Sequence, residues 1–398
     1  MKCVSMIVWN DFLNDARVLK EAESLQKAGY AVTVHALLVP GVTPALEYLD
    51  SGVAVRRVAR NPLQPMAKPR IISGDIVVRG KFAGLQKLWK IATRAMTHVV
   101  LLIKMIRGRP DLIHAHDANT LPTAWLAAKL SGAKLVYDAH EISTSREGYA
   151  GFRNLVAVVE KCLMPRADGT ITTTDSRAKF FARAYHIPRP LVLQNRPRLQ
   201  SSERSSRIRE ELGLQQPWPI VLYQGGIQQG RGLERLIRAA SSIPDAYFVL
   251  IGGGRLERVL HEIVREQGLE DRVFLVPTVP LADLPSYTAS ADIGVQPIEN
   301  TCLNHSTTDS NKLFEYVQAG LPVIASAFPE IRKIVNAYDL GLLVEPGNTG
   351  DLISAITALV NHSEKRMYLS SRAQDAARIL NWEGQEKLLL NLYDRILR

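Results

Sequence analysis

Short runs of apolar residues alternate along the chain with longer stretches in which apolar residues recur at helical spacing. The runs predict strands, and the longer stretches predict helices. Strands are expected at 4–8, 31–37, 53–58, 111–115, 134–137, 169–173 and 191–193, and then at 220–223, 247–251, 273–276, 293–298, 323–325 and 342–344. Helices are expected between many of these strands, and the longest covers 84–107. This alternation is typical of an α/β fold with parallel sheets.

A polar stretch near the middle of the chain divides the pattern into two series. Residues 200–206 read QSSERSS, and strands alternate with helices on both sides of them. The chain has 398 residues, which is enough for two domains of ordinary size. We therefore expect two Rossmann-like, doubly wound domains that face each other across a cleft. The N-terminal domain would cover 1–196 and the C-terminal domain 197–381.

Composition supports a globular protein. Hydrophobic residues make up 46% of the chain and charged residues 22%, unlike a disordered protein. The three cysteines are scattered and offer neither a disulfide framework nor the spacing of a metal site. The N-terminal segment MKCVSMIVWN lacks the features of a signal peptide, and no apolar run approaches the ~20 residues that cross a bilayer. We expect a cytoplasmic protein that requires no metal.

Positive charge is concentrated in one part of the chain. The net charge is +10, and residues 51–110 contain thirteen Lys and Arg against one acid, Asp75. The helix expected at 84–107 is basic and amphipathic, so it either packs on the sheet or lies on an anionic membrane surface. In the second case the protein would be peripheral on the inner face of the cell membrane. Nucleic acid is not expected as a partner, because zinc-finger spacing and RNA-binding aromatic signatures are absent from the sequence.

The most informative stretch begins at Asn311. Asp309 or Ser310 can cap a helix there, and Gly320 is placed to end it. The free N–H groups of its first turn, together with Lys312, suit a phosphate or diphosphate. Glu315 lies three residues after Lys312 and can share its face of the helix, where it could accept hydrogen bonds from ribose hydroxyls. The alternative is a solvated surface pair of little energetic weight.

A glycine-rich loop, 224–232, follows the strand expected at 220–223. Its glycines, Gly225 and Gly226 among them, let a ligand approach the backbone closely. Arg231 can bind phosphate oxygens bidentately, through two parallel hydrogen bonds. The alternative is an ordinary turn with a solvated arginine. The spacing matches neither a Walker loop nor a dinucleotide fingerprint.

Polar residues also follow three strands of the first half. Because parallel strands end at the same edge of a sheet, these side chains are expected to gather there and to suit acceptor binding or proton handling. The alternative is that they cap helices and turns. They are Asn10, Asp11 and Asp15 after the first strand, His116 after 111–115, and Asp138, His140 and Glu141 after 134–137.

Taken together, these motifs resemble the retaining glycosyltransferases of family 4, which have the GT-B fold. The resemblance covers nearly the whole chain. It is carried by NDARVLKEA at 14–22, DLIHAH at 111–116, the two glycine pairs of 225–232, ADIGV at 291–295, and, most specifically, NKLFEY and AGLPV within 311–323. Each piece alone is moderately specific, but their order and separation together are specific.

The resemblance implies transfer of a sugar from a nucleotide-sugar, a UDP- or GDP-sugar, to an acceptor with retention of the anomeric configuration. It implies no cofactor beyond this donor. The acceptor would be a sugar or a lipid-linked or polysaccharide precursor held by the N-terminal domain. The last helix, 382–398, would cross back to that domain. The implied route is front-face attack, in which the leaving phosphate helps to take the acceptor proton.

The resemblance also implies roles for individual residues. Glu315 would hold the nucleotide ribose, and Arg231 and Lys312 would hold the diphosphate. His116 would lie by the donor sugar and complete a catalytic set with Arg231 and Lys312. Further donor contacts are expected from Gly225, Gly226, Gly253, Val276, Asn311 and Leu313.

Two positions depart from the family pattern. Thr307 stands where the family often has a glutamate, so loop amides near 309–311 are expected to contact the donor hexose instead. Gly226 stands where the family often has an arginine, which leaves Arg231 as the main cation of its loop.

Two other functions remain open at this point. A sugar-nucleotide epimerase on the same fold would need no acceptor. A catalytically silent subunit would keep the nucleotide site and bind without turnover.

Overall fold

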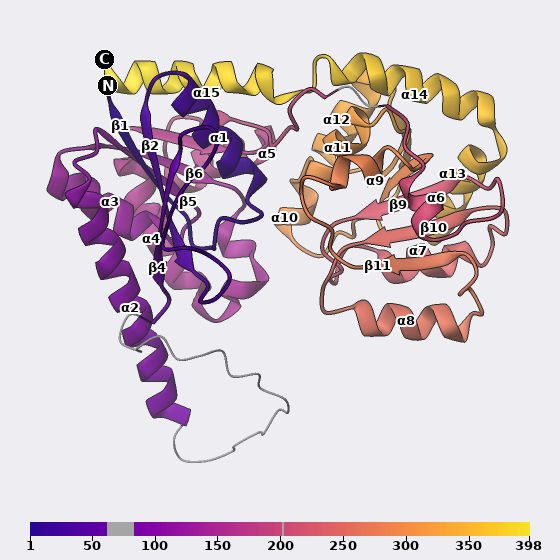
Figure 1. Ribbon diagram of the computed structural model, residues 1–398, viewed down its shortest axis with the longest axis horizontal. Coiled ribbons are helices and arrows are strands. Elements are labelled where there is room, and N and C mark those ends of the chain that lie inside the picture. Colours follow the sequence, from indigo (N-terminus) through magenta and orange to yellow (C-terminus); the bar gives the residue numbers. More distant parts are fainter. Residues whose placement is uncertain (62–82, 201–202) are drawn as a thin grey trace. The chain divides into compact units, whose positions relative to one another are not determined.

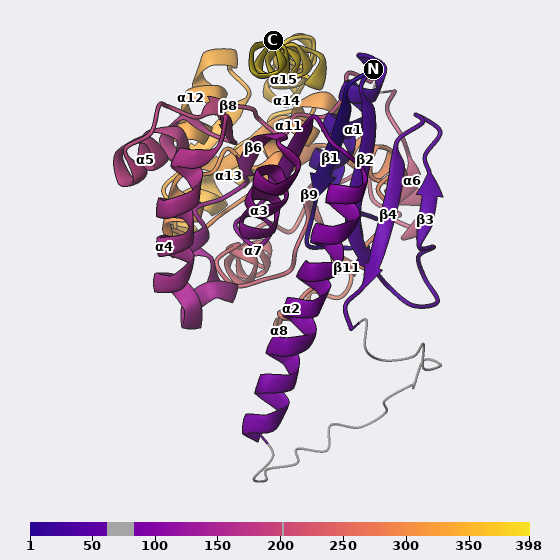
Figure 2. The same ribbon diagram turned by 90° about the vertical axis from the view of Figure 1, so that its left-hand side faces the viewer.

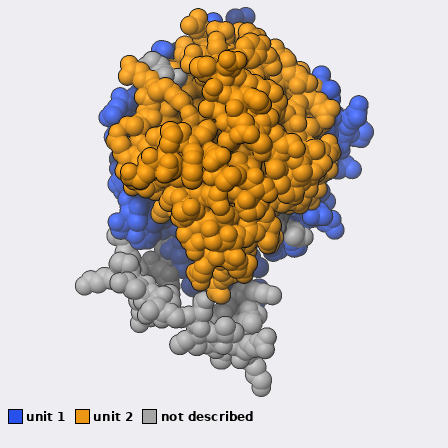
Figure 3. Space-filling view, turned by 90° about the vertical axis from the view of Figure 1, so that its right-hand side faces the viewer, with its two compact units in different colours: residues 1–172, 177–193, 386–398 blue, residues 173–176, 194–385 orange. Residues whose placement is uncertain are grey.

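The computed structural model describes residues 1–61, 83–200 and 203–398, so part of the cationic stretch lies outside the described residues. The chain divides into two compact units (Figure 3). Unit 1 comprises 1–172, 177–193 and 386–398, and unit 2 comprises 173–176 and 194–385. Helix α15 (Trp382–Leu397) contributes to both, because its first four residues belong to unit 2 and the others to unit 1.

Unit 1 is built on an eight-stranded sheet with the order β3-β4-β2-β1-β5-β6-β7-β8. Its neighbouring strands are parallel except for the pair β3 and β4. The strand order reverses between β1 and β5, and ligands of such sheets bind at the carboxyl ends of the strands beside this point. The strands are β1 (Cys3–Ile7), β2 (Ala31–Leu38), β3 (Leu46–Tyr48), β4 (Ala54–Ala59), β5 (Leu112–His116), β6 (Lys134–Ala139), β7 (Gly169–Thr172) and β8 (Leu191–Val192).

Helices cover both faces of this sheet. On one face α2, α3 and α4 lie side by side and share an apolar core with α5 (Figure 2). On the other face lie α1 and α15. Gly169 of β7 has no room for a side chain, because a Cβ there would lie 2.6 Å from Ile396 of α15. The helices are α1 (Ala16–Lys27), α2 (Ala83–Arg107), α3 (Leu121–Ser131), α4 (Arg153–Leu163) and α5 (Asp175–Tyr185).

Unit 2 is built on a six-stranded parallel sheet with the order β11-β10-β9-β12-β13-β14. The order reverses between β9 and β12. The strands are β9 (Ile220–Gln224), β10 (Tyr247–Ile251), β11 (Val273–Val276), β12 (Ile293–Gln296), β13 (Val323–Ser326) and β14 (Gly341–Val344). Both units are therefore Rossmann-like, and the expected α/β fold is confirmed.

Two apolar cores hold helices on the two faces of the second sheet. One core joins α7 (Leu233–Ala240), α8 (Glu257–Glu266) and α13 (Thr349–Asn361) to the sheet. The other joins α6 (Arg207–Glu211), α9 (Leu284–Thr288), α11 (Asn311–Gln318), α12 (Pro329–Tyr338) and α14 (Ser363–Ala377). Figure 1 shows α11 and α9 together beside this sheet. In the described part of the chain, no helix is both long enough and apolar enough to span a membrane.

Candidate functional site

Two glycine-rich loops pack backbone against backbone at the carboxyl edge of the unit 2 sheet. Gly225 donates its N–H to Ile251, and Gly252 approaches so closely that a Cβ on it would lie 2.1 Å from the Gly225 carbonyl oxygen. Gly254 meets the Ile227 carbonyl oxygen in the same way. A side chain at either glycine would separate the loops. The sequence predicted ligand contacts for Gly225, Gly226 and Gly253, whereas Gly252 and Gly254, which it did not single out, hold the two loops together.

Lys312 extends from α11 across the first loop. A Cβ at Gly225 would lie 2.8 Å from the Lys312 Cε, so the glycine leaves the space that the lysine occupies. The Nζ atom lies 5.2 Å from the centre of the Tyr223 ring. Burial, followed by the charge of Arg231, lowers the pKa of Lys312 to about 7, although Glu315 opposes the shift. Lys312 is therefore a half-buried amine that is only partly protonated at pH 7 and lies near a second cation.

The carboxylate of Glu315 is held from the sheet. Gln224, the last residue of β9, donates from Nε2 to Glu315 Oε2 at 2.6 Å. The Gln224 side-chain oxygen, Oε1, accepts from the Thr288 hydroxyl at 2.8 Å, which favours this orientation of the amide. Sequence analysis missed Gln224, although its position at the end of an apolar strand was a usable signal. The amide leaves acceptor positions on Glu315 for a ligand, because a carboxylate offers about four lone pairs.

The N-terminus of α11 differs from the expected cap. Ser310 is the capping residue, but its side chain makes no cap hydrogen bond and its backbone lies in the left-handed region with φ 56°. The Asp309 carboxylate accepts from Gln194 Nε2 at 2.9 Å. Ser310 is thus the N-cap residue, one of the two that the sequence offered, but its side chain does not make the capping hydrogen bond. The positive end of α11 thus faces the loops without a side-chain cap.

Arg231 lies at the end of the first loop and is half-buried. The His305 imidazole of α10 (Leu303–Ser306) packs against Gly230, where a Cβ would lie 2.5 Å from Cε1. Burial and then the Arg231 charge lower the pKa of His305. His305 is therefore a neutral neighbour of the loop. Sequence analysis did not single it out, because only the fold brings it to Gly230.

The remaining predicted donor contacts lie around the same edge. Val276 ends β11 next to β10, and Gly253 lies in the second glycine loop. Thr307, the position that departs from the family pattern, donates its hydroxyl to the Leu303 carbonyl at 2.6 Å. Its own carbonyl accepts from the Thr174 hydroxyl at 2.9 Å. Thr307 thus continues the short helix rather than presenting a carboxylate.

In unit 1 the loop after β1 is organised by its own polar residues. Asn10 donates to Asp15 Oδ2 at 2.7 Å, and Asp15 Oδ1 caps α1 by accepting from the Val18 N–H at 3.2 Å. Asp11 accepts from the Leu13 N–H at 3.2 Å. The predicted acceptor residues Asn10, Asp11 and Asp15 therefore shape this loop, and Asp15 caps α1, in line with the alternative that these residues cap helices and turns.

The strand ends of β5 and β6 bring His116, Asp138 and His140 together. Nδ1 of His116 lies 3.2 Å from Nε2 of His140. Asp138 Oδ2 lies 3.3 Å from His140 Nε2 and 2.8 Å from Arg17 Nε of α1. His116 and Asp138 are buried, whereas His140 is 22% exposed and Glu141, beside it, pairs with Arg146 at 2.9 Å. Burial of Asp138 favours a role through its neighbours over direct acceptor contact.

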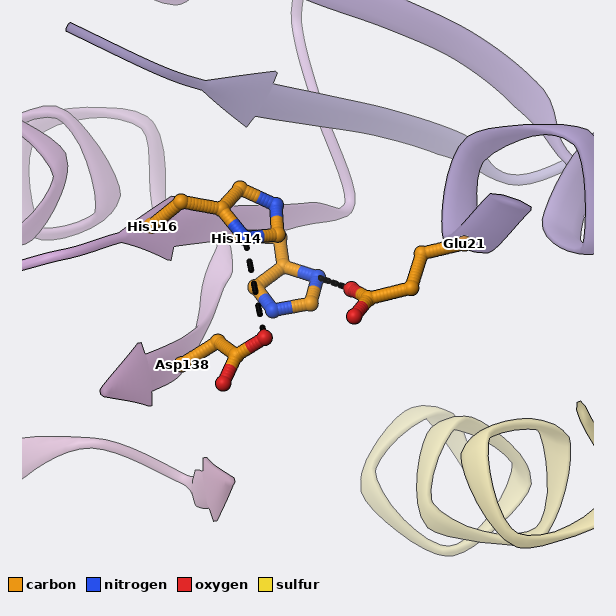
Figure 4. A group of neighbouring side chains, drawn as sticks. All are labelled: Glu21, His114, His116 and Asp138. Atoms are coloured by element: carbon orange, nitrogen blue, oxygen red, sulfur yellow. Dashed lines mark ion pairs between the residues drawn. The ribbon is translucent and has the colours of Figure 1, made fainter. Parts of the chain in front are cut away.

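Four side chains of unit 1 lie close enough together to suggest a metal site (Figure 4). They are Glu21, His114, His116 and Asp138. Their ligand atoms are within 4.8 Å of one another, and all four side chains are buried. Arg17, however, already contacts Glu21 at 3.1 Å and Asp138 at 2.8 Å. The rings of His114 and His116 are stacked with centroids 4.2 Å apart, and Nδ1 of His114 already lies 2.8 Å from the Tyr393 hydroxyl. These four residues do not fit a metal.

The sequence matches two domain families. Residues 15–196 match the glycosyl transferase 4-like domain, and residues 205–376 match the glycosyl transferases group 1. A D-inositol 3-phosphate glycosyltransferase of Xylanimonas cellulosilytica is 22% identical over 94% of this chain and 90% of that protein. Sucrose-phosphate synthase of Thermosynechococcus elongatus superposes with a TM-score of 0.82 at 20% identity, covering 100% of this chain and 99% of the other. Anabaena HepE in complex with UDP-glucose superposes with a TM-score of 0.75 at 18% identity, covering 99% of this chain and 100% of the other.

Proposed function

The chain belongs to the group 1 glycosyl transferases with the GT-B fold, and from that premise we propose that it is a retaining, nucleotide-sugar-dependent hexosyltransferase. The observation that carries the proposal is the gathering of Lys312, Arg231 and the uncapped end of α11 at one sheet edge, beside the Glu315 carboxylate. Positive groups at a helix N-terminus suit a diphosphate, and a held carboxylate suits two ribose hydroxyls. A nucleoside diphosphate carries both features.

The positive groups act on the leaving group. As the bond between the sugar C1 and the diphosphate oxygen breaks, negative charge grows on that oxygen. This growing charge is stabilised by Lys312, Arg231 and the N-terminus of α11. Their interaction with it is stronger in the transition state than in the intact donor, where the oxygen carries less charge. The rest of the proposed donor site is formed by the other predicted donor contacts: Gly225, Gly226, Gly253, Val276, Asn311 and Leu313.

The acceptor hydroxyl attacks C1 from the face that the diphosphate leaves. The new bond from the acceptor oxygen to C1 forms on that face, and the hydroxyl proton passes to the departing phosphate oxygen. The anomeric configuration is thereby retained. His116 is proposed beside the donor sugar, and Asn10, Asp11, Asp15, His140 and Glu141 on the acceptor side, where a sugar or a lipid-linked precursor would bind.

A thermal-shift titration with UDP, GDP and ADP tests the donor site. A ligand that binds only the folded protein at a hundred times its Kd stabilises it by about 2.7 kcal/mol. UDP is the first choice, because HepE was solved with UDP-glucose. Incubation of the matching α-linked nucleotide-sugar with candidate acceptors should then give an α-linked product by NMR. A β-linked product would overturn the retaining mechanism.

The same experiment separates the two alternative functions. An epimerase would convert the nucleotide-sugar without any acceptor, and a silent binding subunit would shift the melting temperature without consuming donor. Transfer that requires an acceptor supports the proposed function against both.

A second proposal concerns the surface of α2. The C-terminal half of this helix packs on the sheet through Leu101 and Met105, which are buried. Its earlier part exposes large apolar side chains: Leu88 is 64%, Trp89 51% and Ile91 62% exposed. The helix contains no acid, and its described side chains include the cations Lys90, Arg94, Lys104 and Arg107.

We propose that this part of α2 contacts an anionic membrane, which would bring a lipid-linked acceptor within reach. Exposed apolar groups enter the headgroup region, and each nearby cation adds on the order of 1 kcal/mol of attraction, weakened by salt. Both of the expectations for this helix, packing on the sheet and lying on a membrane, then apply to different parts of it.

Vesicle co-sedimentation tests the membrane proposal. Wild-type protein should sediment with anionic vesicles at low salt, and less at high salt. Ile91→Glu should weaken sedimentation, whereas Met367→Glu should not, although Met367 of α14 is similarly exposed, at 64% against 62% for Ile91. Equal sedimentation with neutral and anionic vesicles, or equal loss in both variants, would overturn the proposal. A concentration-dependent dimer that Ile91→Glu abolishes would assign the surface to a second copy of the chain.

A further inference from the structure

The ring of His305 in unit 2 is held by one of its edges. Its Nδ1 lies 3.0 Å from the Glu299 carbonyl oxygen and 2.8 Å from the Thr301 hydroxyl. Its Cε1 packs on Gly230, which has φ 74° and where a Cβ would lie 2.5 Å away. The ring is half-buried, and it cannot turn without losing these contacts. His305 is therefore a fixed side chain beside the first glycine loop.

The segment before His305 is joined to that loop, backbone to backbone. Glu299 donates its N–H to the Gly230 carbonyl oxygen at 2.9 Å. Gly232 approaches so closely that a Cβ on it would lie 2.0 Å from the Pro297 carbonyl oxygen. Because the same Glu299 also holds the imidazole, the ring keeps a fixed place relative to the loop.

The Glu299 contact determines the tautomer of the ring. A carbonyl oxygen can only accept, so Nδ1 must carry the proton that is donated to it. The Thr301 hydroxyl can share that proton as a second acceptor. Burial, followed by the charge of Arg231, lowers the pKa of His305, so the ring is neutral at pH 7 and has a single proton. Its Nε2 is therefore unprotonated and can only accept a hydrogen bond.

This Nε2 atom is open to a ligand. Among the described residues, no group bonds it, and it is not one of their fully buried polar atoms without a partner. The charges of Arg231 and Lys312 both lower the pKa of His305, which places the ring within electrostatic reach of the two cations of the proposed diphosphate site. An accepting nitrogen thus stands beside that site and points its lone pair at no protein group.

Two elements lead from the proposed ribose site towards His305. On α11, Glu315 lies one turn inside the helix, Lys312 lies in its first turn, and the segment with His305 precedes the helix. The glycine loop begins beside Gln224, which bonds Glu315, and its later part packs against His305. A nucleotide-sugar carries ribose, diphosphate and hexose in that order, so the hexose is the group expected beyond the diphosphate, at His305.

The chemistry of the nitrogen agrees with this order. An esterified diphosphate has no proton to donate at pH 7, so it is bound by cations and not by an accepting nitrogen. The hydroxyls of a hexose can all donate. A neutral imidazole therefore suits the sugar end of the donor and not its phosphates.

We propose that His305 recognises the donor hexose by accepting a hydrogen bond from one of its hydroxyls through Nε2. The inference rests on the proposed function and adds to it a side chain that selects the sugar, in the segment where Thr307 replaces the family glutamate. A sugar without a hydroxyl in reach would leave this nitrogen unpaired, and sites built to bond a hydroxyl discriminate strongly against analogues that lack it.

Two-bond proton–nitrogen NMR of the free protein, labelled with ¹⁵N-histidine, tests the tautomer. The signals of His305 are those that disappear in His305→Asn. At pH 7 we expect a neutral ring with its proton on Nδ1. A proton on Nε2, or a doubly protonated ring, would overturn the inference. No donor is present, so this result does not depend on whether the protein transfers sugar.

Binding by His305→Asn tests the sugar contact. The asparagine amide nitrogen stands near the position of Nδ1 and can still donate to the Glu299 carbonyl, but nothing replaces Nε2. Calorimetric titrations with UDP, UDP-glucose, UDP-galactose, GDP and GDP-mannose compare this variant with wild type. The matched control is His362→Asn, at an exposed histidine between α13 and α14.

The loss should be confined to the sugar. For the nucleotide-sugar that wild type binds most tightly, affinity should fall roughly fivefold or more in His305→Asn, as for loss of one hydrogen bond, and stay within about twofold for the free nucleotide. The His362→Asn protein should match wild type. Equal changes for nucleotide-sugar and free nucleotide would overturn the inference and leave His305 as a loop contact. Failure of the wild type to bind either UDP or GDP would instead contradict the proposed function, whatever the tautomer of His305.

Discussion

Lys312 is the residue whose protonation should change most when a nucleotide binds. In the free protein burial and Arg231 lower its pKa to about 7 from an ordinary value of 10.5. A diphosphate would raise that pKa, because an anion favours the ammonium form. At pH 8 the free side chain is mostly neutral, so binding should take up nearly one proton, and affinity should fall as pH rises above 7.

Calorimetric titration of UDP in two buffers of different ionisation enthalpy measures this uptake. In Lys312→Arg the uptake should vanish, because arginine stays charged throughout this pH range. No proton uptake by the wild type, despite tight binding, would place the diphosphate away from Lys312.

Gly225 and Gly226 offer a matched test of the first glycine loop. Gly225 has φ 122°, and a Cβ there would lie 2.8 Å from Lys312 Cε, whereas the nearest atom to a Cβ at Gly226 is 3.6 Å away. Gly225→Ala should therefore displace Lys312 and weaken UDP binding by roughly tenfold or more, about 1.4 kcal/mol. Gly226→Ala should bind within about threefold of wild type. Equal affinities in both variants would show that the loop glycine does not set the position of Lys312.

Residue spacing predicted part of the site, and tertiary contacts supplied the rest. Lys312 and Glu315 share one helix, so their proximity followed from helical periodicity. Gln224 and His305 reach the site from other elements. Gln224 bonds Glu315, 91 residues further along the chain, and His305 packs against Gly230 in a separate loop. A single sequence offers no spacing rule for such contacts.

At the scale of elements, the Tyr316 side chain helps to anchor α11 to the sheet. The Tyr316 hydroxyl accepts from the Gln224 N–H at 3.3 Å and lies 3.1 Å from the Leu222 carbonyl oxygen, to which it can donate. Its ring lies over Gly294, where a Cβ would be 2.4 Å away. The helix is thereby held at the reversal point between β9 and β12.

Tyr316→Phe should keep the ring packing and lose the hydroxyl contacts. Because the hydroxyl is buried, its loss should cost about 1–3 kcal/mol of stability, measurable by urea unfolding. Tyr368→Phe is the control, since the Tyr368 hydroxyl bonds Asp339 on the surface and its loss should cost less than about 0.5 kcal/mol. Similar losses in the two variants would contradict the anchoring role.

Three elements that the sequence pattern missed bury few large apolar side chains. α14 is polar over most of its length and buries only Leu369 and three alanines. β3 is a three-residue edge strand with no buried position. α4 follows irregular 3-10 turns at 143–152 and buries only Glu160. The central strands were found because their buried positions are nearly continuous, as parallel strands covered on both faces require.

At the scale of the whole molecule, α15 is the element that the two units share. Gln385 near its start accepts from the Gln194 N–H at 2.8 Å within unit 2, and Tyr393 near its end contacts His114 within unit 1. The polar stretch suggested a boundary after 196, whereas contacts divide the chain after Leu193 and assign 173–176 to unit 2. Polarity marks a linker only approximately, because Gln194 takes its partners from unit 2.

The central claim is that a nucleoside diphosphate binds unit 2 at α11 with its ribose on Glu315. Calorimetric titration of UDP against wild type, Glu315→Ala and the surface control Glu262→Ala tests it most directly. Loss of charge-assisted hydrogen bonds costs about 1.5–3 kcal/mol, so Glu315→Ala should bind roughly ten- to a hundredfold more weakly, and the control should match wild type. Unchanged affinity in a folded Glu315→Ala protein would contradict the claim and move the nucleotide to another part of the chain.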